Sequence, residues 1–262
     1  MAEPRIQFTD GAAYERQMGV WSRLAGEVFL EWLAPPPGLR WIDVGCGNGA
    51  FTELIVARCA PVDVRGIDPS EGQLGFARTR PGAHGVTFQQ GDAMALPFAD
   101  RTFDAGVMAL VIFFVSDPAK GIAELVRVVR PGGLVATYAW DMYGGGFPLE
   151  PLQAEMRAMG MTPVYPPSAG ASRMDALRDL WTGAGLEEVE TREIAVQRSF
   201  PDFDDFWATC RLSASIRPML AMMTPDDVER LKTLVRTRLP ADAAGRITYG
   251  ARANAIQGRV PK

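Results

Sequence analysis

The stretch that decides the fold reads Trp41-Ile42-Asp43-Val44-Gly45-Cys46-Gly47-Asn48-Gly49-Ala50. Its apolar start predicts a strand that leads into alternating glycines, and the amphipathic pattern that follows predicts a helix. Because glycine has no Cβ, such a turn can take unusual backbone angles and let a ligand lie directly on main-chain N–H groups. The stretch therefore predicts a cofactor site between a strand and a helix.

The glycines alone leave the type of cofactor open. The spacing Gly45-x-Gly47-x-x-Ala50 satisfies the relaxed dinucleotide fingerprint, and Asp68 follows at about the expected 20-residue distance. A tight turn that merely needs glycine is a further interpretation. Neither the spacing nor the glycine content separates a nicotinamide dinucleotide from another adenosine-bearing cofactor.

Length and composition narrow the protein class. The chain has 262 residues, is 47% hydrophobic and carries a net charge of −4, so we expect a sizeable core and no nucleic-acid partner. We find neither a secretory leader nor an apolar stretch of membrane-spanning length, and expect a cytoplasmic protein. The cysteines Cys46, Cys59 and Cys210 match no zinc or disulfide framework, and His84 is the only histidine. We therefore expect buried cysteines, no metal site and no Ser-His-Asp triad.

Strand-like and helical runs alternate along the first part of the chain, which predicts a parallel sheet. We expect strands at 40–45, 62–67, 86–90, 104–110 and 133–140, and helices at 13–33, 49–59, 70–79 and 117–130. Ser70, Asp117 and Thr224 have the pattern of helix N-caps, and Pro131-Gly132-Gly133 should end a helix before the next strand. Later in the chain we expect a helix at 172–184, an edge strand at 186–194, helices within 201–240 and a last strand at 246–260. The fold class is thus α/β, a Rossmann-like, doubly wound, mostly parallel seven-stranded sheet with helical insertions that form a cover.

Three aspartates fall at the ends of predicted strands. Asp43 closes the first strand, Asp68 the second and Asp92 the third. Open α/β sheets bind ligands at the carboxyl ends of their strands. There, Asp68 can accept hydrogen bonds from vicinal ribose hydroxyls and Asp92 from the exocyclic amine of a purine. Each aspartate alone could be a cap or a turn residue, but three at one sheet edge favour a ligand.

Together with Leu96-Pro97-Phe98 and Arg127-Val128-Val129-Arg130-Pro131-Gly132-Gly133, this pattern resembles the class I S-adenosylmethionine-dependent methyltransferases. The resemblance covers roughly residues 10 to 140, and residues 14–22 are similar to the start of the ubiquinone/menaquinone-biosynthesis branch. It implies S-adenosylmethionine as cofactor, S-adenosylhomocysteine as product and a small-molecule methyl acceptor. The cofactor residues that it implies are Asp43, Gly45, Cys46 and Gly47 at the methionine end, Asp68 with its neighbour Pro69 at the ribose, Asp92 and Ala93 at the adenine, Ala109 and Leu110 under the sulfonium, and Tyr14 and Trp21 nearby.

The chain departs from the family after the fourth strand. Many members carry a histidine pair where this chain has Phe113-Phe114, so an acid/base role is lost there. The aromatic pair predicts either an apolar wall of the ligand site or core packing. Asp141 and Tyr143, which follow the fifth strand, are the remaining candidates for a base. Methyl transfer from a sulfonium is an in-line displacement that mainly needs alignment and desolvation, so a catalytic triad is not required.

We expect one domain over residues 1–262. Its expected parts are an N-terminal helical cover (1–38), a cofactor-binding core (39–140), substrate-covering insertions (141–171 and 201–240) and the C-terminal part of the sheet (172–200 and 241–262). The acceptor pocket should form where the N-terminal helix, 141–171 and 201–222 meet over the strand ends, with an apolar lining from Met219, Met222, Met223, Phe203, Phe206 and Trp207. We therefore expect methyl transfer to a small apolar or amphipathic acceptor. A module that binds S-adenosylmethionine without turnover and an NAD(P)-dependent oxidoreductase remain as alternatives.

Overall fold

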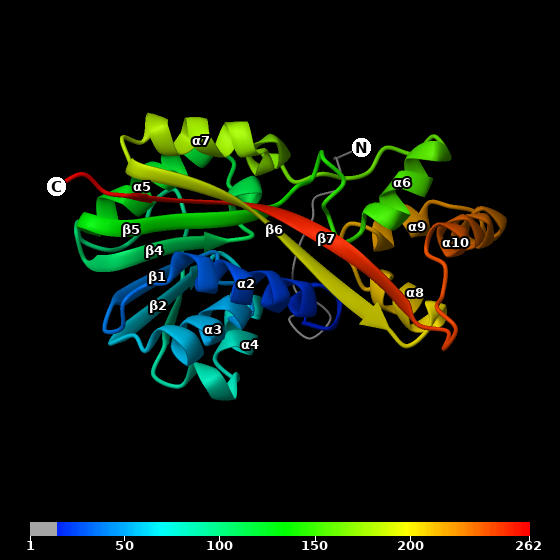
Figure 1. Cartoon of the computed structure of the whole chain (residues 1–262), viewed down its shortest axis with the longest axis horizontal. Coiled ribbons are helices and arrows are strands. Elements are labelled where there is room, and N and C mark those ends of the chain that lie inside the picture. Colours follow the sequence, from blue (N-terminus) through cyan, green and yellow to red (C-terminus); the bar gives the residue numbers. More distant parts are fainter. Residues whose placement is uncertain (1–14) are drawn as a thin grey trace.

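The chain folds around a twisted sheet with helices on both faces (Figure 1). The computed structural model describes residues 15–262, and within them the sheet has seven strands in the order β3-β2-β1-β4-β5-β7-β6. The parallel strands are β1 (Arg40–Val44), β2 (Asp63–Asp68), β3 (Thr87–Gln90), β4 (Phe103–Ala109) and β5 (Val129–Trp140). Strand β7 (Ile247–Arg259) runs antiparallel between β5 and the edge strand β6 (Glu187–Phe200). The predicted α/β fold, its edge strand and its last strand are confirmed.

The strand order reverses beside β1, where one neighbour is β2 and the other is β4. Strand β1 is buried on both faces after its first residue, which explains why Trp41-Ile42-Asp43-Val44 is almost continuously apolar. In an open α/β sheet a crevice forms at such a reversal, outside the carboxyl ends of the strands. The glycine turn that follows β1 lies at this point.

Helices cover the two faces of the sheet, as Figure 1 shows. One side carries η1 (Glu15–Gly19), α2 (Val20–Leu33), α3 (Ala50–Cys59) and α4 (Glu71–Ala77), and the other carries α5 (Pro118–Val128) and α7 (Met174–Gly183). The predicted N-caps are confirmed: the side chains of Ser70, Asp117 and Thr224 accept hydrogen bonds from the backbone N–H groups of Gln73, Lys120 and Asp227.

The expected end of helix α5 is wrong. The helix stops at Val128, and β5 begins at Val129, so Pro131-Gly132-Gly133 lies inside the strand and not before it. The pairing of β4 with β5 jumps from Phe103↔Val129 to Ala105↔Leu134, so the chain bulges there. The bulged segment is held by the C-terminal strand, since the N–H of Gly132 donates to the carbonyl of Val260 at 2.8 Å.

A second group of helices gathers beyond the carboxyl ends of β4 and β5 (Figure 1). It comprises α6 (Glu150–Ala158), α8 (Phe203–Cys210), α9 (Arg217–Ala221) and α10 (Pro225–Arg238). The short turns η3 (Ile112–Phe114) and η4 (Ala169–Ser172) contact each other and β5. Helices α6 and α10 are joined by an ion pair from Arg238 to Glu155 at 2.6 Å. These helices cover the carboxyl ends of the strands.

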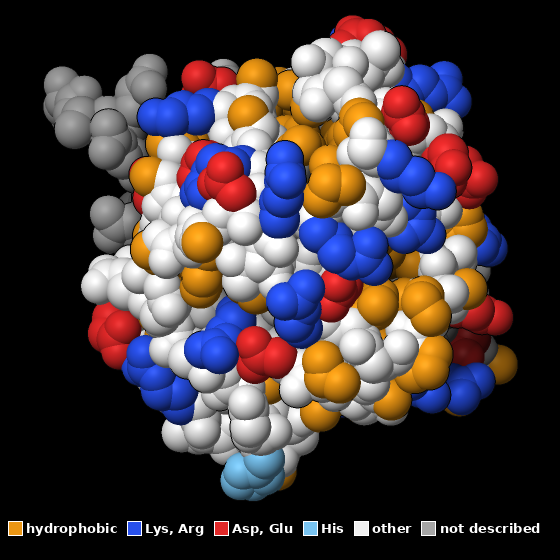
Figure 2. All heavy atoms as spheres, turned by 90° about the vertical axis from the view of Figure 1, so that its left-hand side faces the viewer, with side chains coloured by type: hydrophobic (Ala, Val, Ile, Leu, Met, Phe, Trp, Pro, Cys, Tyr) orange, Lys and Arg blue, Asp and Glu red, His pale blue; other side chains and the backbone are white. Residues whose placement is uncertain are grey.

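The opposite end of the sheet carries charged side chains of both signs. Figure 2 shows this face, on which basic and acidic side chains are interspersed. Asp104 at the start of β4 accepts from Arg40 at 3.0 Å and from Arg130 at 2.6 Å. These bonds hold the pKa of the Asp104 carboxyl well below its ordinary value, and the bond from Arg40 has the largest effect. Within residues 15–262, no helix has the length and apolar character that crossing a membrane would need.

Candidate active site

The glycine turn after β1 has one open position. Gly45, Gly47 and Gly49 all have positive φ, at 72°, 53° and 79°. A Cβ on Gly45 would lie 2.5 Å from the side chain of Val111, and one on Gly49 would lie 3.0 Å from that of Ala77. A Cβ on Gly47 would meet no other described residue within 4 Å. Packing within the protein therefore demands the outer two glycines, whereas at Gly47 the backbone faces open space that a ligand can enter.

Asp43 places a buried carboxylate beneath this turn. The Thr52 hydroxyl on α3 donates to Asp43 Oδ2 at 2.6 Å, while Asp43 Oδ1 has no hydrogen-bond partner among the described residues. Burial raises the pKa of Asp43 to about 7; the bond from Thr52 opposes this shift, and the neighbouring charge of Asp68 adds to it. A buried oxygen without a partner fits a ligand that brings its own donor.

Asp68 at the end of β2 clamps the glycine turn. Its carboxylate accepts from the N–H of Gly47 at 2.9 Å and from the N–H of Ser70 at 2.8 Å. Burial raises the pKa of Asp68, and these two backbone bonds oppose the shift. An ionised carboxylate has about four lone-pair sites, so acceptor capacity remains for ribose hydroxyls. From the sequence we predicted that Asp68 binds the ribose, but we did not predict its hydrogen bonds to the backbone of Gly47 and Ser70.

Asp92 forms the turn that follows β3. Its side chain is exposed and accepts from the N–H of Met94 at 2.8 Å, next to Ala93. This turn leads into the Leu96-Pro97-Phe98 segment, which Arg127 on α5 fixes by donating to the carbonyls of Leu96 at 2.9 Å and Phe98 at 2.8 Å. The two distant motif segments therefore form one unit, in which an arginine positions the loop that carries Asp92.

Leu110 and Val111, which follow β4, contact both β5 and the glycine turn. Leu110 is buried with φ of +61°, a strained angle for a residue with a Cβ, and its N–H donates to the carbonyl of Tyr138 at 2.9 Å. Its neighbour Val111 packs on Gly45. Strain of this kind concentrates at functional sites.

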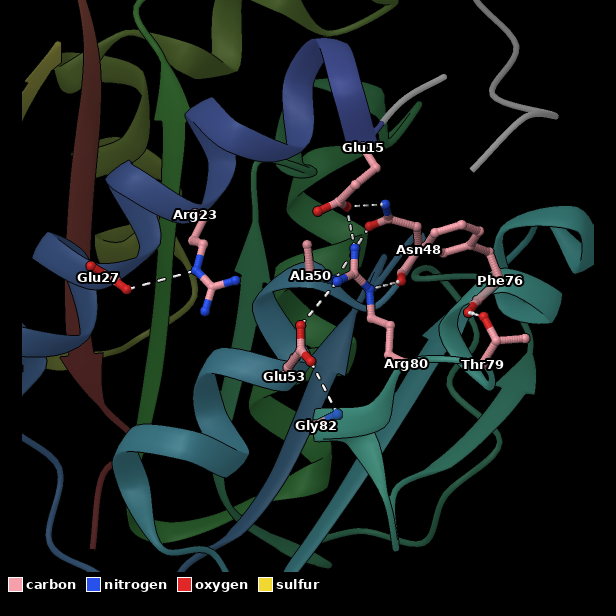
Figure 3. Close-up of polar contacts among 10 residues, drawn as sticks. All are labelled: Glu15, Arg23, Glu27, Asn48, Ala50, Glu53, Phe76, Thr79, Arg80 and Gly82. Carbon is pink, nitrogen blue, oxygen red and sulfur yellow. Dashed lines mark hydrogen bonds and ion pairs between the residues drawn. The ribbon is translucent and has the colours of Figure 1, made fainter. Parts of the chain in front are cut away.

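The N-terminal segment is tied to the glycine turn by an ion network, drawn in Figure 3. Arg80 pairs with Glu15 of η1 and with Glu53 of α3 at 2.9 Å, and it donates to the carbonyl of Asn48 at 2.6 Å. The Arg80 side chain is only 9% exposed. A Cβ on Gly19 would lie 2.7 Å from the Glu15 carboxylate, so glycine there leaves the room that Glu15 needs. No local sequence signal links these residues, and we did not predict the network.

The remaining predicted positions have other surroundings. Cys46 is buried with Leu74 and Phe88, and, as we expected, Cys59 and Cys210 are buried free thiols too. The carbonyl of Pro69 accepts from Gln90 at 2.8 Å. Trp21 is buried against Tyr249, with ring centroids 5.1 Å apart, so the structure places it in an aromatic part of the core. Tyr14 lies outside the described residues.

The two candidate bases differ in their surroundings. Asp141 accepts from Arg252 at 2.6 Å and from the N–H of Gly144 at 2.9 Å, so its carboxylate holds a turn. Tyr143 is 58% exposed and lies beside the ring of Tyr165, with centroids 5.5 Å apart. Among residues 15–262, no group of three or more histidine, cysteine or acidic side chains could hold a metal ion.

A cavity opens over the ends of β4 and β5, where the N-terminal segment, residues 141–171 and the 201–222 segment meet. The volume of the cavity is about 50 Å³. Its lining contains Gln17, Met18, Leu110, Phe113, Phe114, Trp140, Met142, Phe147, Gln153, Val164, Tyr165, Pro166, Ser213 and Ser215. Phe113 and Phe114 line this cavity, and Phe113 is also a buried member of the hydrophobic core against which Phe114 packs, so the pair has features of both predicted roles.

The expected source of the apolar lining is wrong. None of the methionines and aromatic residues that we expected from 203–223 belongs to the cavity wall. Met219 and Phe206 are buried in the core, and Met222 is 71% exposed. Helices α8 and α9 pack their apolar side chains inward, so from this part of the chain the serines between them reach the cavity.

Known proteins share both the sequence pattern and the fold. Residues 42–137 match a family model described as a methyltransferase domain. The chain is 34% identical over 192 residues to a malonyl-(acyl-carrier protein) O-methyltransferase of Methylococcus capsulatus, covering 72% of this chain and 65% of that one. It is 35% identical over 144 residues to a demethylmenaquinone methyltransferase of Renibacterium salmoninarum, covering 54% and 57%. The matches span less than two thirds of either relative.

A solved structure with the same fold contains the methyl donor. It is phosphoethanolamine N-methyltransferase 2 of Haemonchus contortus in complex with S-adenosyl-L-methionine, with a TM-score of 0.58 and 18% identity over 96% of this chain and 56% of that one. At this identity the likeness concerns the fold. The sequence matches, the strand order and the glycine turn agree with one another, and residues 42–137 of the chain carry a methyltransferase domain.

Proposed function

We propose that this chain binds S-adenosylmethionine across the carboxyl ends of β1, β2 and β3 and transfers its methyl group to a small acceptor in the cavity. One observation carries the proposal: the glycine turn and the cavity share a wall. Val111 packs on Gly45 in the turn, and the preceding residue, Leu110, lines the cavity. A ligand that lies on the turn at Gly47 can therefore extend toward the cavity.

The proposed cofactor contacts follow the order of the strands. Asp43, Gly45, Cys46 and Gly47 hold the methionine end, where Asp43 Oδ1 lacks a partner among the described residues and fits the ammonium group. Asp68 and Pro69 hold the ribose, Asp92 and Ala93 the adenine, and Ala109 and Leu110 border the sulfonium. When bound, the cofactor supplies an activated methyl group.

The chain's own contribution to the reaction is alignment and exclusion of water. Such positioning can lower a barrier by about 7 to 11 kcal/mol without an acid or base. The aromatic wall at Phe113 and Phe114 keeps water from the reacting atoms. Asp141 is engaged by Arg252, and we assign no catalytic base.

The same proposal divides the chain into working parts. Residues 39–140 bind the cofactor, and 1–38, 141–171 and 201–240 select the acceptor, while 172–200 and 241–262 complete the sheet. The family match covers 42–137, which lies within the first of these parts. The two sequence relatives are named for different acceptors, a carrier-bound malonyl group and a menaquinone precursor, which supports a variable cover above a common core. We propose a cytoplasmic location, and the only support for it is that the three cysteines are buried and form no disulfide.

Calorimetry with S-adenosylmethionine, S-adenosylhomocysteine and NAD tests the first step. We expect binding of the first two and none of NAD; the reverse result would refute the cofactor assignment. The full chain is then incubated with methyl-labelled S-adenosylmethionine and lipid, quinone and aromatic extracts. Label in a small molecule supports transfer, whereas label that enters only protein contradicts a small acceptor.

A further inference from the structure

Two side chains in the cavity wall carry polar atoms that no described residue satisfies. They are Trp140 Nε1, at the end of β5, and Gln153 Oε1, on α6. Trp140 is 1% exposed and Gln153 is 2% exposed. Buried polar atoms in proteins are nearly always paired, because a buried atom that has lost water and gained no partner is destabilising. Two such atoms in one cavity wall indicate a partner from outside the chain.

The chemistry of the two atoms specifies that partner. An indole Nε1–H can only donate a hydrogen bond, and an amide Oε1 can only accept one. A hydroxyl group does both, since its O–H donates and its oxygen accepts. The other lining hydroxyls already have partners within the chain: Ser213 and Ser215 bond one another at 3.0 Å, and the Tyr165 hydroxyl accepts from Arg157 at 3.4 Å.

The charge of the lining excludes an ionised ligand. Among the described residues that line the cavity, none is aspartate, glutamate, lysine or arginine. An ionised group that enters such a wall loses its hydration without gaining an opposite charge from the protein, which is strongly unfavourable. The rest of the wall is aromatic and aliphatic, as at Phe113, Phe147 and Val164, and suits an uncharged apolar body.

We propose that the cavity selects a neutral acceptor with an apolar body and a phenolic or alcoholic hydroxyl that donates to Gln153 Oε1 and accepts from Trp140 Nε1. Gln153 is then the residue that determines specificity. The inference rests on the proposed function only in naming this ligand the methyl acceptor. Binding in the cavity itself can be measured without any turnover.

The test measures binding of three probes to the full chain saturated with S-adenosylhomocysteine. The probes are 2-naphthol, 2-methoxynaphthalene, which can accept but not donate, and 2-naphthoate, which is charged. We expect 2-naphthol to bind about tenfold more tightly than 2-methoxynaphthalene, the scale of one lost hydrogen bond to a buried acceptor. We expect 2-naphthoate to bind more weakly than either.

Gln153→Met keeps the side-chain length and removes the acceptor. We expect it to weaken 2-naphthol about tenfold and to change 2-methoxynaphthalene less than twofold. Trp140→Phe removes the donor and should weaken both, which keeps the inference testable if one variant folds poorly. Gln197→Met on the exposed face of β6 is the matched control and should change neither.

Each contrary outcome has a separate meaning. Equal affinity for 2-naphthol and 2-methoxynaphthalene overturns the role of Gln153, and preference for 2-naphthoate overturns the neutral ligand. Absence of binding of all three probes, with S-adenosylhomocysteine bound, overturns the inference and leaves the proposed function standing. Failure to bind S-adenosylhomocysteine overturns the proposed function, and the probes, measured on the free chain, still decide the cavity.

Discussion

Replacing Gly47 or Gly45 by alanine should separate ligand contact from protein packing within one turn. Both positions have positive φ, which costs an alanine about 1 to 2 kcal/mol. At Gly47 that is the whole expected loss of stability, because the new methyl group meets nothing within 4 Å among residues 15–262. At Gly45 the methyl group would sit 2.5 Å from Val111, and such overpacking adds about 1 to 3 kcal/mol. We therefore expect losses of about 1 to 2 kcal/mol for Gly47→Ala and about 2 to 5 kcal/mol for Gly45→Ala.

Binding should rank the variants in another order. If S-adenosylmethionine lies on the Gly47 backbone, Gly47→Ala places a methyl group in its path and should weaken binding at least about tenfold, a typical result of one steric conflict in a packed contact. Gly185→Ala is the matched control: its φ is +75° and its Cβ would also meet no described residue within 4 Å, but it lies after helix α7. It should lose as much stability as Gly47→Ala and bind S-adenosylmethionine normally.

Urea denaturation measures the stability of the three variants, and calorimetry measures their binding. Unchanged affinity in Gly47→Ala would refute the idea that the cofactor approaches this backbone. Equal stability of Gly45→Ala and Gly47→Ala would refute the packing argument at Val111, whatever the binding result.

Three further perturbations test the groups around this turn. Asp68→Ala should weaken S-adenosylmethionine binding by about 1.5 to 3 kcal/mol in calorimetry, since it removes acceptors for both the ligand and the Gly47 N–H; a normal affinity contradicts the ribose assignment. The pKa of Asp43 is raised to about 7 in the folded chain from 3.8 in the unfolded chain, so between these pH values the folded state holds a proton that the unfolded state has lost. Protonation of Asp43 therefore stabilises the fold fully below about pH 4, and this stabilisation is lost as pH rises through 7. Between pH 5 and pH 8, urea titrations should show the free energy of unfolding of the wild type falling by about 2 to 3 kcal/mol more than that of Asp43→Asn. If the difference between the two proteins is the same at both pH values, the pKa shift of Asp43 is wrong. Arg80→Met takes the cation away from the carboxylates of Glu15 and Glu53 and should cost about 2 to 4 kcal/mol in the same assay, whereas the exposed Arg58→Met should cost under about 1 kcal/mol; equal losses would show that the network adds nothing.

Local sequence determined the order of the elements and the place of the cofactor turn. The period of apolar residues, the caps at Ser70, Asp117 and Thr224 and the three glycines after β1 are all properties of short segments, so they could be predicted without tertiary information. The start of β5 could not. Its Pro131-Gly132-Gly133 segment has a typical helix-ending composition, and hydrogen bonds to Val260, the residue that follows the C-terminal strand, hold it in line with the sheet.

By itself, then, the sequence determined the α/β fold and the methyltransferase domain, and it predicted a site at the carboxyl ends of the strands, because these depend on local periodicity and on one contiguous motif. The tertiary structure alone decided which glycine is open to a ligand, which arginine joins Glu15 to the turn, and which side chains face the cavity. The physical reason is that such contacts join residues far apart in the chain, and their distances depend on how the helices pack. Gln153 and Trp140 look ordinary in the sequence, and burial in one wall without partners among the described residues is what makes them informative.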